Sequence, residues 1–142
     1  MILSDVNVLI GAFRVDHPHH ITCRKWLLDV VSGEARFGMS TPVLSALVRI
    51  TTNNRIFRAP SSLEQAFGFC NDLLAQPHCQ LVEPGERHWQ IFERLCTEAD
   101  VRGRRVSDAW LAALAIESGS DWITLDRDFA RFPGLTWRTP TA

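Results

Sequence analysis

Four aspartates stand at positions where alternating strands and helices would bring acids together. Asp5 directly follows the short apolar run MILS, and Asp126 and Asp128 follow the apolar run DWITL. Asp108 lies near the start of the mostly apolar segment VSDAWLAALAIESG. Each aspartate has an ordinary structural explanation when taken alone, because Asp caps helices and favours the first turn of a helix. Their chemical meaning depends on whether they converge.

Convergence would make these carboxylates a site for a hard metal ion. In open α/β sheets ligands bind beyond the carboxyl ends of the strands, so Asp5 and Asp126 are expected at one sheet edge. Neighbouring carboxylates raise each other's pKa unless a cation lies among them. Oxygen ligands select Mg²⁺ or Mn²⁺, which keep water ligands and bind phosphate substrates. The sequence therefore predicts metal-dependent phosphoryl transfer or phosphodiester hydrolysis.

Other chemistries fit the sequence less well. It contains no G-x-x-x-x-G-K-[ST], no G-x-G-x-x-G after the first strand and no G-x-S-x-G. The D-x-D pair of WITLDRD allows aspartyl-phosphate chemistry, but only 14 residues follow Asp128, whereas that motif usually opens its fold. His17, His19, His20 and Cys23 are types that bind zinc, but their spacing does not match the common structural sites and DHPHH is more typical of a helix start.

The elements that must position the aspartates follow from periodicity and turn signals. We expect strands at residues 1–4, 36–40, 79–83 and 121–125 and a last apolar stretch at 135–139, and helices at 6–13, 19–31, 41–52, 61–76, 86–99 and 106–119. A basic turn, VRGRR, precedes the last helix. Short strands alternating with helices predict one α/β domain over residues 1–142, with a parallel sheet covered on both faces.

Composition favours a globular protein of the cytosol. The chain is 46% hydrophobic with a net charge of −1, lacks an apolar run long enough for a membrane span and does not begin like a signal peptide. The charge alone does not indicate a nucleic-acid partner. Arg102, Arg104 and Arg105 precede Asp108 closely enough to contact RNA phosphates, but they fit a solvated basic turn as well. Two sets of residues are expected to be mainly packing groups: the reduced cysteines 23, 70, 79 and 96, and the tryptophans 26, 89, 110, 122 and 137.

The amphipathic helix predicted within residues 40–53 contains one position that invites a second explanation. Val43, Leu47 and Ile50 form an apolar stripe, and Ala46 lies on its border, one turn from Arg49. A side chain at this border can reach the rim of the core, where active sites often open. Arg49 is placed equally well for the acidic site and for the helix surface.

The ordered motifs resemble those of a known family. SDVNVLIGAF, TPVLSALVRITTNNRIF, LVEPGERHWQIF, VSDAWLAALAIESG and TLDRDFARFPGL are similar, nearly end to end, to the PIN-domain nucleases, and within them to the VapC-type ribonuclease toxins of bacterial toxin–antitoxin pairs. The resemblance implies a doubly wound parallel sheet and an acidic pocket that binds Mg²⁺ or Mn²⁺. By motif, Asp5, Asp108 and Asp126 carry over as catalytic metal-site acids, Asp128 as an accessory acid, and Asn7 and Thr124 as supporting polar groups.

The resemblance also implies an activity and partners. Water activated by the metal would cleave structured RNA such as tRNA or rRNA, leaving a 5′-phosphate and a 3′-hydroxyl. The partners implied are a small VapB-type antitoxin, whose C-terminal segment lies along a groove and often places a basic side chain in the pocket, and a second copy of the chain as a homodimer.

The sequence departs from the family at Ala46. The family pattern S-E-x-x-R has a glutamate where this chain has Ala46 in the run SALVR. Either a natural member has lost a ligand, or the alanine was introduced to inactivate a toxic nuclease; the intact surroundings favour the second. We expect weakened metal binding and little RNA cleavage. The alternative is a catalytically inactive PIN-like domain that binds antitoxin or RNA without cleaving it.

Overall fold

The computed structural model describes residues 1–141 and builds them from short strands and longer helices. The strands are β1 (Ile2–Ser4), β2 (Phe37–Met39), β3 (Cys79–Leu81), β4 (Asp121–Ile123) and β5 (Trp137–Arg138). The helices are α1 (Val6–Phe13), α2 (His20–Ser32), α3 (Thr41–Thr51), α4 (Leu63–Leu74), α5 (His88–Ala99) and α6 (Arg104–Glu117), with a 3₁₀ turn η1 (Arg127–Arg131).

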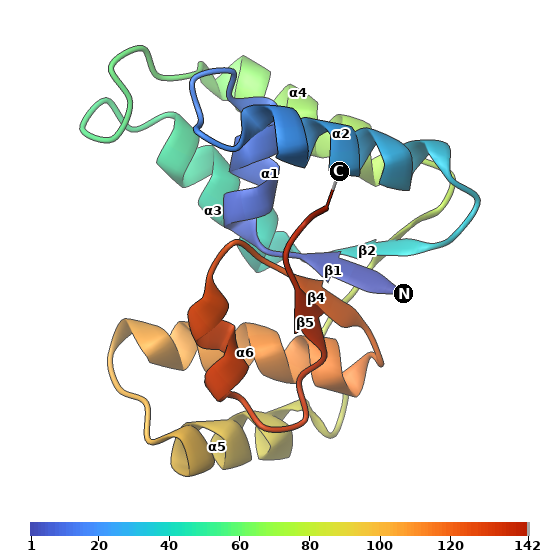
Figure 1. Ribbon diagram of the computed structural model, residues 1–142, viewed down its shortest axis with the longest axis vertical. Coiled ribbons are helices and arrows are strands. Elements are labelled where there is room, and N and C mark those ends of the chain that lie inside the picture. The colour runs from blue at the N-terminus through green and yellow to red at the C-terminus, as the bar shows by residue number, and fades with distance from the viewer. Residues whose placement is uncertain (142) are drawn as a thin grey trace.

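The strands form one parallel sheet in the order β3-β2-β1-β4-β5. The chain builds outward from β1 through β2 and β3 and then crosses to the other side of β1 to add β4 and β5. Helices α1 to α4 cover one face of the sheet and α5 and α6 cover the other (Figure 1). The predicted doubly wound α/β fold is confirmed, and its strand order reverses between β1 and β4.

The core lies where the helices meet the central strands. Leu3 and Trp122, on neighbouring strands, are fully buried, as is Phe37 on β2. Helix α6 packs through buried alanines, including Ala109 and Ala112, whose small side chains allow a close approach. Such strands, buried on both faces, explain why the sequence shows apolar runs instead of alternation.

Several predicted boundaries and the predicted burial of Trp89 are wrong. The strands are two or three residues long, shorter than the stretches expected. Helix α6 begins at Arg104, so two residues assigned to a basic turn belong to its first turn, after Gly103 with φ +63°. Trp89 was expected in the core but is 67% exposed, because α5 turns His88 and Leu95 inward instead.

The remaining packing expectations hold in part. Trp26 and Trp122 are buried, and Trp110 and Trp137 are partly buried. All four cysteines are free, two of them buried and two partly exposed. No helix within residues 1–141 is long and apolar enough to cross a membrane.

Candidate active site

Three predicted acids are delivered to the sheet edge where the strand order reverses. Asp5 follows β1 and caps the N-terminus of α1, while Asp126 follows β4 and caps η1. Asp108 approaches the same edge from α6, and its charge acts on the Asp5 carboxylate together with that of Asp126. The expected convergence of Asp5, Asp108 and Asp126 is therefore present in the fold.

Asp5 is the most enclosed acid of the site, with only 6% of its surface exposed. Its Oδ1 accepts a hydrogen bond from the Val6 amide at 2.7 Å, and its Oδ2 accepts one from the Thr124 hydroxyl at 2.7 Å. The Asn7 side-chain amide donates to the same Oδ2 at 3.3 Å. These donors fix the direction in which the carboxylate faces.

Thr124 and Asn7 join the ends of β1 and β4. The Thr124 hydroxyl oxygen accepts from the Asp126 amide at 3.0 Å while donating to Asp5. The Asn7 side-chain oxygen accepts from the Leu125 amide at 3.0 Å. The two polar residues predicted as supporting groups therefore connect the loop that carries Asp126 to the loop that carries Asp5.

Burial raises the pKa of two of the acids, Asp5 and Asp108. Desolvation raises the pKa of Asp5 to about 6, against the opposing effect of its hydrogen bonds, and the negative charges of Asp108 and Asp126 add to the rise. Desolvation also raises the pKa of Asp108, although the bond from Arg105 opposes this. Such shifts cluster at functional sites, where charged groups are held out of water.

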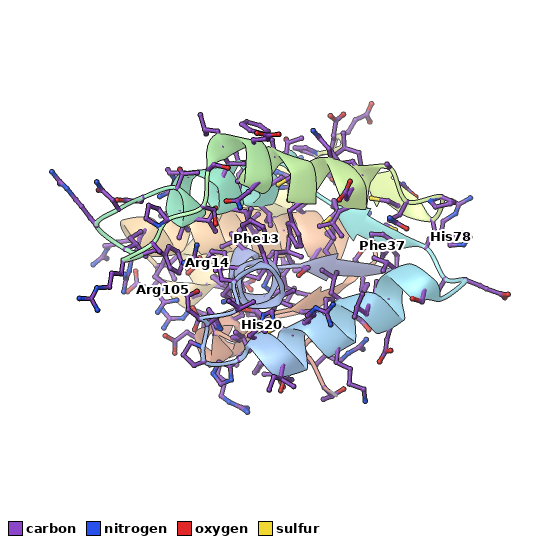
Figure 2. All side chains as sticks on the ribbon, turned by 90° about the horizontal axis from the view of Figure 1, so that it is seen from above. Phe13, Arg14, His20, Phe37, His78 and Arg105 are labelled. Atoms are coloured by element: carbon purple, nitrogen blue, oxygen red, sulfur yellow. The ribbon has the colours of Figure 1, made fainter. Side chains whose placement is uncertain are left out.

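Arg105 binds the other three aspartates of the site. Its NH1 donates to Asp108 Oδ2 and to Asp126 Oδ2, each at 3.0 Å, and its NH2 donates to Asp128 Oδ2. Figure 2 shows Arg105 on the side of the molecule where the strands end, away from Phe37 and His78 at their beginnings. From the sequence, an RNA contact and a solvated basic turn were both left open for Arg105 and this pairing was missed, although the spacing of Arg105 and Asp108, three residues apart on one helix, is a signal for it.

Ala46 faces the same site. A cleft of about 510 Å³ is lined by Ala46, Asp5, Asp108, Arg49 and Phe92, among others. The border position predicted for Ala46 is therefore directed toward the acids, where its methyl group offers no ligand. Arg49 lines the cleft without forming an ion pair within residues 1–141.

The other two arginines predicted to meet RNA lie outside the ion-pair cluster. Arg102 pairs with Asp100 on the surface at 3.2 Å, with both side chains largely exposed. Arg104 is exposed in the first turn of α6.

The donor set suits a hard divalent cation. Asp5, Asp108, Asp126 and Asp128 provide carboxylate oxygens, the ligands that Mg²⁺ and Mn²⁺ prefer, and a guanidinium cation already bonds three of them. Even so, no three His, Cys, Asp or Glu side chains in the described part of the chain are grouped closely enough to hold a metal. The same holds for His17, His19, His20 and Cys23. In that segment His20 Nδ1 contacts the Gly11 carbonyl at 2.8 Å.

Similarity to known proteins shows which family the chain belongs to. Residues 2–135 match the family described as PIN domain. Ribonuclease VapC25 of Mycobacterium tuberculosis is 44% identical over 135 residues, covering 95% of each chain. Ribonuclease VapC43 of the same species is 39% identical over 140 residues, covering 99% of this chain and 95% of the relative.

Solved structures share the fold at lower identity. VapBC2 of Rickettsia felis, solved bound to a DNA fragment of its promoter, is 19% identical and covers 98% of both chains with a TM-score of 0.71. Mycobacterium tuberculosis VapC20, described as a toxin that cleaves the sarcin–ricin loop, is 18% identical with a TM-score of 0.66, covering 96% of this chain and 99% of that one. The chain thus belongs to the PIN domain family and, within it, to the VapC ribonucleases.

Proposed function

We propose that this chain is the toxin of a toxin–antitoxin pair, a metal-dependent endoribonuclease whose activity is weakened by Ala46. The observation that carries the proposal is the meeting of Asp5, Asp108 and Asp126 at the point where the strand order reverses. The 39% to 44% identity to proteins named VapC ribonucleases supports the reaction class. RNA is the proposed substrate, with tRNA or rRNA as its class.

The protein residues would divide the work between binding and orientation. Asp5, Asp108 and Asp126 would hold Mg²⁺ or Mn²⁺, with Asp128 as an accessory acid. The bound cation would supply positive charge that activates water and stabilises the scissile phosphate. Thr124 and Asn7 keep the Asp5 carboxylate and the loop of Asp126 in fixed orientations, because their hydrogen bonds join both loops.

RNA contact and assembly belong to the same proposal. Exposed Arg104, whose charge acts on Asp108, and exposed Arg102 two residues before it would contact RNA phosphates, which provide much of the affinity for nucleic acid. The VapBC structures of Rickettsia felis and Haemophilus influenzae, which share the fold, support a small antitoxin partner. A homodimer and a cytoplasmic location stay predictions; light scattering after gel filtration measures the first.

Restoring an acid at position 46 tests the catalytic proposal. Ala46→Glu places a carboxylate in the cleft beside Asp5 and Asp108, so RNA cleavage with Mn²⁺ or Mg²⁺ should rise by at least about tenfold, as expected for improved metal binding. Ala46→Gln is the matched control, with the same length and no charge, and should remain near the parent. Asp108→Asn in the Ala46→Glu background should abolish the gain and excludes contaminating nuclease.

The same experiment distinguishes RNA cleavage from the second candidate function, which is binding without cleavage. A non-catalytic domain that binds antitoxin or RNA is favoured by the methyl group of Ala46 where the family has an acid. If Ala46→Glu binds Mn²⁺ but cleaves no RNA, the binding function is supported. If the parent and Ala46→Glu cleave equally well, position 46 has no role as a metal ligand.

A further inference from the structure

Arg105 occupies a position where a positive charge is unfavourable for the helix itself. It lies in the first turn of α6, next to Arg104, and that turn contains no acidic residue. The N-cap is Gly103, which provides no side-chain acceptor for the free amides. Because a helix N-terminus carries partial positive charge, a cation there needs favourable contacts from elsewhere.

Those contacts come from the acidic site. Arg105 bonds Asp108 from its own helix and both Asp126 and Asp128 from the loop after β4. Its side chain is only 23% exposed, so the fork is enclosed by the aspartates instead of extending into solvent. A guanidinium binds carboxylates through several donors in one plane, which suits this bridging geometry.

Arg105 and a divalent cation would compete for the same carboxylate oxygens. Asp108 Oδ2 and Asp126 Oδ2 each lie 3.0 Å from NH1 of Arg105. Mg²⁺ would draw its oxygen ligands to about 2.1 Å in a near-octahedral shell, so the oxygens now turned toward Arg105 would have to turn toward the metal. The two cations would also repel each other. The absence of a ready-made metal cluster among residues 1–141 agrees with acids arranged around Arg105 instead.

We propose that Arg105 is the internal counter-cation of this site, bonding Asp108, Asp126 and Asp128 in the metal-free protein and leaving them when a divalent cation binds. The proposal rests on the metal-dependent function proposed above. It makes Arg105 a positioning residue: it keeps the acids together and competes with the metal for them. A purely structural ion pair would instead persist beside the bound metal.

Removing Arg105 tests the competition directly. Mn²⁺ binding to metal-free protein is measured by calorimetry for the parent, Arg105→Gln and Arg104→Gln, in the Ala46 chain and in the Ala46→Glu background. Arg104→Gln is the matched control, since it removes the same charge from the same helical turn without removing an ion pair to the acids. Arg105→Gln should bind Mn²⁺ about tenfold more tightly than Arg104→Gln, a typical coupling between competing ligands.

Thermal unfolding gives a second readout that requires no cleavage. Without metal, Arg105→Gln should melt at a lower temperature than Arg104→Gln, because the acids lose their counter-cation. With excess Mn²⁺ its melting temperature should rise more than that of the control. Arg105→Lys keeps the charge but not the fork, so its Mn²⁺ affinity should lie between those of the parent and Arg105→Gln.

Three results would count against the proposal, and they differ from one another. Equal Mn²⁺ affinity in the Arg105 and Arg104 variants overturns the competition and leaves the metal-dependent function standing. Weaker Mn²⁺ binding in Arg105→Gln than in the parent makes Arg105 a partner of the metal and overturns it as well. If no variant binds Mn²⁺ in either background, the metal-dependent function fails and the competition fails with it.

Discussion

Asp5 differs from the other acids of the site in having only neutral donors around its carboxylate. Thr124, Asn7 and the Val6 amide contact it, whereas Arg105 bonds the other three aspartates. Because burial removes the carboxylate from water and no cationic side chain among the residues described compensates for this, the ionised form is costly, and the pKa of Asp5 is raised from 3.8 to about 6. A group of this kind is prepared to accept a cation, because a bound cation relieves the cost of its charge.

The raised pKa of Asp5 predicts how stability depends on pH without metal. The folded state binds a proton more readily than the unfolded state, so stability is greatest below the unfolded pKa of 3.8 and falls as the pH rises through about 6. Ionised Asp5 should cost up to about 3 kcal/mol above pH 6. Urea unfolding with EDTA between pH 4 and 7 measures this loss, which should be smaller in Asp5→Asn. An equal pH dependence in the two proteins would contradict the prediction.

At the scale of elements, close packing against α2 holds α1, the helix that Asp5 caps, in place. A Cβ at Gly11 would lie 2.7 Å from Cys23 Sγ, and Cys23 is fully buried on α2. By contrast, a Cβ at Gly68 of α4 would meet no atom within 4 Å. Gly11 therefore permits the close contact between α1 and α2. Gly68 lowers the helix propensity of α4, and no neighbouring atom requires a glycine there.

Alanine at these two glycines should therefore have opposite effects. Gly11→Ala forces Cys23 or α1 to move and should lower the free energy of unfolding by about 1–3 kcal/mol. Gly68→Ala should raise it by about 0.5–1 kcal/mol, since it removes flexibility from a helix interior with room for a methyl. Urea denaturation of both variants gives the comparison. Stabilisation by Gly11→Ala would mean that the α1–α2 contact is looser than described.

On the scale of the whole molecule, the site lies on the most interior part of the sheet. Strand β1 pairs with β2 on one side and β4 on the other, and the Asp5 amide continues this pairing by donating to the Ile123 carbonyl at 2.8 Å. Strand β3 lies at an edge, with two of its three residues exposed. The acids that follow β1 and β4 are thus anchored to the centre of the fold.

Hydrogen exchange should reveal this difference between centre and edge. The Asp5 amide, at the junction of β1 and β4, should exchange only through global unfolding. The Val82 amide, which donates to the Met39 carbonyl at 2.8 Å just after edge strand β3, should exchange faster through local opening. Native-state exchange followed by NMR at increasing denaturant measures both. Equal protection of Asp5 and Val82 would show that the sheet opens as one unit.

The sequence by itself determined the architecture and most of the acidic site. Alternating strands and helices predict a parallel sheet, and parallel strands end at one edge, so Asp5 and Asp126 were expected at that edge. Their closeness also requires β1 and β4 to be neighbours in the sheet, as they are in the fold. The 3.6-residue period also placed Ala46 on the border of the apolar stripe of its helix, where a side chain can reach the rim of the core. These inferences succeed because periodicity sets where a side chain points relative to its own element.

Only the tertiary structure decided which groups meet across elements. Arg105 looked like part of a solvated basic turn, but α6 begins early enough to bring it against Asp126 and Asp128, which lie on the loop after another strand. Trp89 has the spacing of a core residue, yet the way α5 packs leaves it exposed. Local spacing determines which residues share one face of a helix, but not how that helix is rotated against its neighbours. The rotation decides both the ion pairs of Arg105 and the exposure of Trp89.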